Sequence, residues 1–141
     1  MIPRKEYSVY FYFSYILILL YGMFALMVLI GSDWDQIIQT NDVFGAALGR
    51  RILISRVVAI VLAFCSIVTI LFSHKLFGRS LLFIVIWSWA SYIDDTSIFQ
   101  QGLLEVTQIA GGYLVMFRPL YLLLITYVLV ENWARYGEHY K

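Results

Sequence analysis

Charged residues are scarce in this sequence. Lys, Arg, Asp and Glu make up 13% of its 141 residues, whereas hydrophobic residues make up 62%. Soluble domains usually carry about 25% charged residues, so this composition predicts an integral membrane protein surrounded by membrane lipids. The formal net charge is only +1, and no dense basic patch is present. Nucleic-acid binding needs such a patch, so no nucleic-acid partner is predicted.

Residues that carry redox, metal or nucleophilic chemistry are also few. Cys65 is the single cysteine, which excludes an intramolecular disulfide and a paired-cysteine redox centre. The two histidines, His74 and His139, lie at polar segment ends and form no ligand cluster or Ser-His-Asp arrangement. The Gly111-Gly112 pair is too short for a phosphate loop. We therefore predict no catalytic residues, no metal and, apart from a bound quinone or lipid, no cofactor. The chain on its own is not expected to be an enzyme.

Four apolar runs are long enough to be membrane spans, over residues 7–31, 51–73, 80–98 and 113–133. The first run is too long for the apolar region of a signal peptide and lacks a small-residue cleavage site, which predicts a retained helix. After it, apolar residues at helical spacing predict a short interfacial helix over residues 33–48. The predicted fold is an all-α, four-transmembrane-helix bundle that forms a single membrane domain over residues 1–141.

Lysine and arginine are distributed unevenly between the two sides of this bundle. One side holds the two termini and the basic turn of residues 74–79, with Arg4, Lys5, Lys75, Arg79, Arg135 and Lys141. The other side holds only Arg50 and Arg51. Cytoplasmic loops carry the excess of positive residues, so both termini are predicted to be cytoplasmic, in a bacterial inner membrane.

The third apolar run ends early, at an acidic pair. Only 14 uncharged residues separate Arg79 from Asp94. They span about 21 Å of helix, against a hydrocarbon core of ~30 Å. Asp94 and Asp95 are therefore expected below the membrane surface, where carboxylates need partners. Arg56 in the second run and Arg118 in the fourth reach a similar depth in the outer half of the bundle.

These four charges allow three interpretations. The first is an ion-pair clasp that holds the second, third and fourth helices in register. Alternatively, they line a pocket open to the outer face for a lipid headgroup, a quinone or a small anion, with Trp87, Ser91 and Tyr92 beside them. A proton or ion pathway is the third interpretation, although the inner half of the bundle is almost wholly apolar. A cation site at Asp94, Asp95 and Glu105 is disfavoured, because adjacent helical residues point about 100° apart.

Two features bear on helix packing around these charges. Arg56 shares a helical face with small residues, namely Ala59, Ala63 and Ser66. Such a face predicts close approach of another helix and an Arg56 side chain directed into the bundle. In the fourth run Pro119 frees a backbone carbonyl one turn earlier. Its neighbour Arg118 is placed to bind that carbonyl or to pair with the acids of the third run.

The order of these features resembles the four-helix membrane modules of the DoxX-like and vitamin-K-carboxylase-like (HTTM) families. The resemblance rests on the acidic loop after the first run and on three short segments, Phe77-Gly78-Arg79, Trp87-Ser88-Trp89 and Phe117-Arg118-Pro119-Leu120. It implies an accessory membrane subunit, in some cases linked to redox systems. The lysine-based catalytic features of the carboxylase are not identifiable here, so no activity carries over.

The predicted function is that of a small accessory or structural subunit of a larger membrane complex, with a redox complex as one candidate and with other membrane-protein subunits as partners. The alternative is a quinone- or lipid-binding protein that uses the pocket at Arg56, Asp94, Asp95 and Arg118. A component of a small proton or ion pathway is the third candidate.

Overall fold

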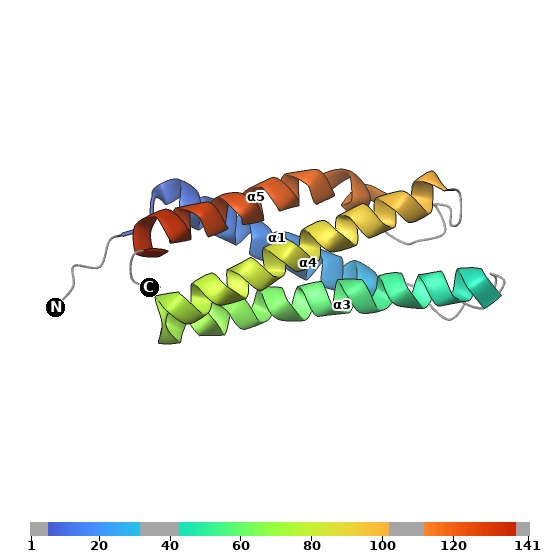
Figure 1. Ribbon diagram of the computed structural model, residues 1–141, viewed down its shortest axis with the longest axis horizontal. Coiled ribbons are helices and arrows are strands. Elements are labelled where there is room, and N and C mark those ends of the chain that lie inside the picture. Colours follow the sequence, from blue (N-terminus) through green and yellow to red (C-terminus); the bar gives the residue numbers. More distant parts are fainter. Residues whose placement is uncertain (1–5, 32–42, 102–111, 138–141) are drawn as a thin grey trace.

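A computed structural model describes residues 6–31, 43–101 and 112–137 of the chain. It contains four helices, which are α1 (Val9–Gly31), α3 (Val43–Phe72), α4 (His74–Gln100) and α5 (Gly112–Tyr136) (Figure 1). The described residues include no strand. The prediction of an all-α fold with four long helices is therefore confirmed.

The first helix begins at a polar cap and then stays apolar throughout. The Ser8 hydroxyl accepts a hydrogen bond from the backbone N–H of Phe11 at 3.1 Å, as a helix-capping serine does. The buried positions are Phe11, Ser14, Ile18 and Gly22, which recur every three or four residues. Most of the other side chains point outward although they are apolar, including Phe13 and Met27.

A single residue, Ser73, separates α3 from α4. Its hydroxyl accepts a hydrogen bond from the backbone N–H of Lys75, and its carbonyl accepts one from that of Phe77. Ser73 thus caps α4, because a short polar side chain can replace the missing helical partner. The sequence prediction of a basic turn over residues 74–79 was wrong, since these residues form the first turns of α4.

The structure also moves the start of the second predicted span. This span was expected to begin at residue 51, after an interfacial helix over residues 33–48. Instead α3 begins at Val43 and continues through Gly49, so residues 43–48 are its first turns. The rest of the predicted interfacial helix, residues 33–42, lies outside the described residues. In α5 the helix continues through Pro119 without ending.

The helices run up and down in an antiparallel bundle. Each packs on the next described helix along the chain, and α5 closes the ring by packing on α1. The start of α1, the end of α5 and the turn between α3 and α4 lie at the same end of the bundle (Figure 1). We call this the terminal end, and the opposite end is the loop end.

The interior is built from large apolar side chains on all four helices. The most deeply buried include Phe11, Ile52, Phe77, Leu81, Ile84, Leu122, Ile125 and Val128. Two helical segments, Val9–Gly31 and Lys75–Ile98, are long and apolar enough to cross a membrane. Large apolar side chains also cover much of the outer surface, including Val9 at 81% exposure and Ile93 at 64%.

Candidate ligand-binding cavity

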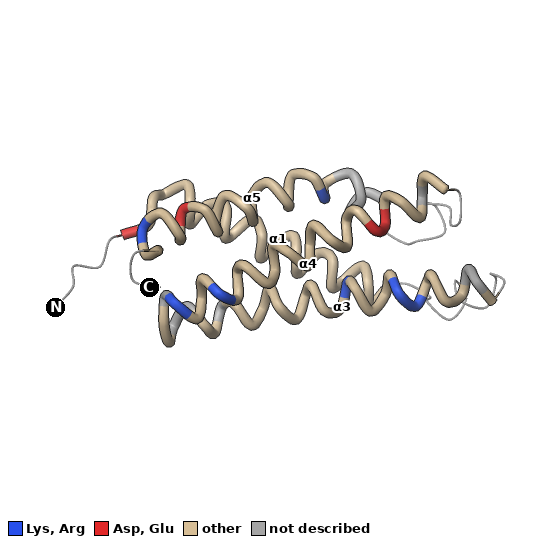
Figure 2. The backbone as a smooth tube through the Cα atoms, viewed as in Figure 1, with Lys and Arg blue, Asp and Glu red and all other residues tan. Residues whose placement is uncertain are grey.

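The charged side chains form two groups, one toward each end of the bundle, with an uncharged stretch between them (Figure 2). The group nearer the loop end contains the four residues that the sequence singled out, together with Arg51. We call these five residues the charged layer: Arg51, Arg56, Asp94, Asp95 and Arg118. Within this layer two ion pairs link neighbouring helices.

The inner ion pair joins α4 to α5. Arg118 donates a hydrogen bond from Nη1 to Oδ2 of Asp95, and both side chains are largely buried, with 13% and 4% of their surface exposed. The guanidinium of Arg118 also lies over the ring of Tyr92, 5.8 Å from its centre, in a cation–π contact. The other carboxylate oxygen of Asp95, Oδ1, is buried and has no hydrogen-bond partner among the described residues.

The outer ion pair joins α3 to α4, and it uses Arg51 rather than Arg56. Nη2 of Arg51 lies 2.6 Å from Oδ1 of Asp94, and the two side chains are 61% and 34% exposed. The hairpin geometry explains this pairing. Arg51 lies 22 residues before Ser73 and Asp94 lies 21 residues after it, so the two are at the same level. Arg56 lies more than one turn nearer Ser73, and it makes no hydrogen bond or ion pair with any described residue.

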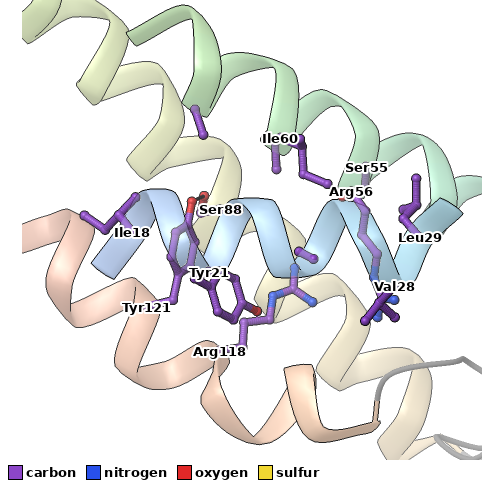
Figure 3. A pocket seen from close by; sticks show the side chains of 14 residues that line it. Ile18, Tyr21, Val28, Leu29, Ser55, Arg56, Ile60, Ser88, Arg118 and Tyr121 are labelled. Carbon is purple, nitrogen blue, oxygen red and sulfur yellow. Dashed lines mark hydrogen bonds between the residues drawn. The ribbon is translucent and has the colours of Figure 1, made fainter. Parts of the chain in front are cut away.

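Arg56 instead lines a cavity of about 80 Å³ between α1 and α3, with α4 and α5 at its back (Figure 3). Its side chain lies close enough to Asp95 and Arg118 to interact with both electrostatically. Arg118 lines the same cavity. The remaining lining residues are Ile18, Tyr21, Gly22, Ala25, Val28 and Leu29 from α1, Ser55, Ala59, Ile60 and Ala63 from α3, Ser88 from α4 and Tyr121 from α5.

Small residues create this cavity. Gly22 is buried, yet a Cβ atom added to it would meet no atom within 4 Å. Ala25 on the same helix, with Ala59 and Ala63 on α3, leaves the space opposite it unfilled. The small-residue face of α3 was predicted to bring another helix close. That contact forms at Ser66, which hydrogen-bonds Tyr15 of α1 at 3.1 Å, whereas Ala59 and Ala63 face the cavity.

The polar groups of the cavity are held by their neighbours. The rings of Tyr21 and Tyr121 stack with centroids 4.7 Å apart, and the hydroxyls of Tyr121 and Ser88 lie 3.3 Å apart. The hydroxyl of Ser55 hydrogen-bonds that of Ser91 at 2.6 Å. These contacts fix the wall of the cavity before any ligand enters, which lowers the entropic cost of binding.

The structure separates the predicted site residues into three groups. Arg56 and Arg118 line the cavity, and Asp95 with Tyr92 supports Arg118 from behind. The other three predicted residues do not line the cavity. Ser91 binds Ser55, the indole N–H of Trp87 donates to the carbonyl of Ser55 at 3.0 Å, and Asp94 pairs with Arg51: these side chains join α3 to α4.

Sequence reasoning missed Tyr21, Gly22 and Tyr121 as site residues. The sequence does mark Tyr21 and Gly22. In the middle of an apolar run, a tyrosine hydroxyl lies next to a residue that has no side chain to fill the neighbouring space. No comparable signal marks Tyr121. Among the described residues that line the cavity there is no histidine, cysteine or carboxylate, and its polar groups are those of arginine, serine and tyrosine.

At the terminal end a second polar cluster joins α1 to α5. It consists of Tyr7, Ser8, Tyr127, Glu131, Asn132 and Arg135, and we call it the terminal cluster. Glu131 accepts hydrogen bonds from the backbone N–H of Ser8 at 2.8 Å, from the Ser8 hydroxyl at 2.7 Å and from Arg135 at 2.9 Å. The hydroxyl of Tyr7 donates to Oδ1 of Asn132 at 2.6 Å.

Comparisons with known proteins returned no match to a family model, to a curated protein or to a solved structure. The resemblance to DoxX-like and HTTM modules stays a prediction, and the function has to be argued from the geometry of this chain.

Proposed function

We propose that this protein is an integral membrane protein that binds an amphiphilic small molecule, a lipid or a quinone, in the cavity between α1 and α3. The observation that supports this proposal most directly is the cavity itself. Two arginines and a few serine and tyrosine side chains line it together with apolar side chains. Ligand sites commonly combine a mostly apolar wall with a few well-placed polar groups.

The charges of the cavity lie toward one end of the bundle axis. Arg56 lies at that end with Val28 and Leu29, whereas Ile18, Ser88 and Tyr121 lie toward the other end (Figure 3). From Ile18 to Leu29, α1 rises about 16 Å. An amphiphile would place its head beside Arg56 and Arg118. The volume of about 80 Å³ holds only the adjoining part of its apolar body, directed toward Ile18 and Ile60.

A membrane location supports the same proposal. The apolar outer surfaces of α1 and α4 would be costly in water but suit contact with lipid. In a membrane of ~30 Å hydrocarbon thickness, the charged layer lies toward one face of the bundle. A ligand from the bilayer would then present its head at that depth.

Binding without a catalytic group is compatible with the role of an accessory subunit. The lining of the cavity offers arginine, serine and tyrosine side chains for recognition, and a bound lipid or quinone would serve the protein's own structure or a neighbouring subunit. Assembly with other membrane proteins, cytoplasmic termini and a bacterial inner membrane stay predictions from the sequence, as does the proton or ion pathway.

The proposal is tested by filling the cavity. The Gly22→Leu variant places a side chain where the structure shows open space. Gly31→Leu is the matched control, because Gly31 also has no atom within 4 Å of an added Cβ but is exposed and lies outside the cavity. Lipids and quinones that remain after purification in mild detergent are measured by native mass spectrometry. We expect a bound amphiphile in the wild type and in Gly31→Leu, and its loss in Gly22→Leu. Equal retention in all three proteins would contradict the proposal.

A further inference from the structure

The charged layer contains three arginines but only two carboxylates, so one arginine has no carboxylate to pair with. Arg51 is paired with Asp94, and Arg118 is paired with Asp95. Arg56 is the fifth member, and the described residues offer it no carboxylate of its own. Arg50 is also unpaired among the described residues, but it lies on the exposed surface. The extra positive charge inside the bundle is therefore that of Arg56.

A rearrangement of side chains does not remove this charge. Arg56 is near enough to Asp95 for electrostatic interaction, and Oδ1 of Asp95 has no partner among the described residues, so Asp95 is the carboxylate to which a rearranged Arg56 would turn. One carboxylate would then lie between two guanidinium groups. The group formed by Arg56, Asp95 and Arg118 keeps a net charge of +1 in either arrangement.

An uncompensated cation inside a membrane bundle is costly, and such residues usually mark a binding site or a conduction path. Arg56 and Arg118 both line the cavity, and an arginine offers several N–H donors to an oxyanion. A neutral ligand such as a quinone would satisfy some of these donors but would leave the charge in place.

We propose that the cavity selects amphiphiles whose head carries a negative charge, a carboxylate or a phosphate, and that Arg56 supplies the opposite charge. This inference rests on the proposed function, which requires only that an amphiphile binds. The head accepts hydrogen bonds from Arg56, while Arg118 stays fixed by Asp95 and Tyr92. The apolar chain extends along Ile18 and Ile60.

The test compares lipids that differ in head charge. Delipidated protein in an uncharged detergent is titrated at pH 9 with oleate, which is ionised there, and with monoolein, which carries the same chain on a neutral head. Binding is followed by native mass spectrometry. We expect the Kd of oleate to be at least about ten-fold lower than that of monoolein, because a charge-assisted hydrogen bond contributes that much. Phosphatidylglycerol against phosphatidylcholine repeats the comparison for a phosphate head, and a preference in either pair supports the proposal.

Three variants assign the preference to Arg56. Arg56→Gln should remove the preference for the anionic lipid, and Arg56→Lys should retain most of it. Arg50→Gln removes the same charge from the exposed surface and should leave the preference unchanged. An unchanged preference in Arg56→Gln would overturn the inference.

Failure of this inference can be distinguished from failure of the proposed function. Equal binding of charged and neutral lipids in the wild type, abolished for both by Gly22→Leu, would overturn the selectivity for anions and keep the binding function. If neither kind of lipid binds the wild type, the binding function fails as well.

Discussion

At the terminal end of the bundle, Tyr7 and Ser8, just before α1, form a network with α5. Glu131 accepts hydrogen bonds from Ser8 and Arg135, and Tyr7 donates to Asn132. At the other end, in the charged layer, one buried carboxylate oxygen lacks a partner among the described residues, and Arg56 faces a cavity. Both clusters join helices.

This difference indicates what each cluster is for. Buried polar groups in folded proteins are almost always hydrogen-bonded, so a satisfied cluster needs no explanation beyond holding two helices together. In the charged layer Oδ1 of Asp95 lacks a donor and Arg56 lacks a paired carboxylate among the described residues, so this cluster is not fully satisfied. We therefore interpret the terminal cluster as a structural contact, and the charged layer as a structural ion pair beside the proposed binding site.

The largest effect is expected at the inner ion pair. Arg118→Leu leaves the carboxylate of Asp95 buried without its cation, and we expect it to lower the free energy of unfolding by about 3–5 kcal/mol. Unfolding by SDS in mixed micelles measures this change. Replacing Asp95 as well, in Arg118→Leu/Asp95→Leu, should restore most of the stability. Arg51→Leu in the exposed pair should cost less than about 1 kcal/mol. Equal losses for Arg118→Leu and Arg51→Leu would contradict the contrast between the two pairs.

A smaller loss is expected in the terminal cluster. Glu131→Leu removes the acceptor for the Ser8 N–H, the Ser8 hydroxyl and Arg135, and should lower the free energy of unfolding by about 2 kcal/mol. The same unfolding assay applies, and Glu131→Gln should lose less because it keeps one acceptor oxygen. If Glu131→Leu leaves stability unchanged, the terminal cluster is not the structural contact described above.

At Arg56 we expect a substitution to raise the stability rather than lower it. Arg56→Leu removes a partly buried charge with no paired carboxylate, so we expect the delipidated protein to gain about 1 kcal/mol of stability. Thermal unfolding of delipidated wild type and variant measures this, and added oleate should then stabilise only the wild type. A loss of stability in the delipidated variant would show that Arg56 acts as part of a clasp.

The smallest effect concerns Gly22. Alanine there adds a methyl group in open space and removes the conformational freedom of glycine from a helix interior, so stability should rise by about 0.5–1 kcal/mol. Thermal unfolding checks this as well. A destabilised Gly22→Ala would mean that the space beside Gly22 is closed in the folded protein.

Much of the fold could be predicted from the sequence because apolar run length is a strong signal. The four helices lie where the apolar runs lie, and their ends differ from the predicted ends by at most eight residues. The errors arose where polar residues were taken to end a helix. Residues 74–79 are basic but helical, because Ser73 alone caps α4. Residues 43–48 contain a glycine and still belong to α3.

The site could be predicted only in part. Asp95 and Arg118 pair as one interpretation required, because both lie at the same depth in antiparallel helices. The partner of Asp94 was missed, since Arg51 was taken as the first residue of its span and counted with Arg50 among the charges of the outer side, and the α3–α4 turn was placed too late in the chain. The cavity was not predicted, because whether small residues such as Gly22 and Ala59 bring helices together or leave a gap depends on what lies opposite them.

The measurement that tests the account most directly is native mass spectrometry of the protein purified in mild detergent, on the wild type and on Gly22→Leu. The account predicts a bound amphiphile with a negatively charged head on the wild type, and none on Gly22→Leu. A wild-type protein that carries no amphiphile and takes up neither oleate nor phosphatidylglycerol would contradict it.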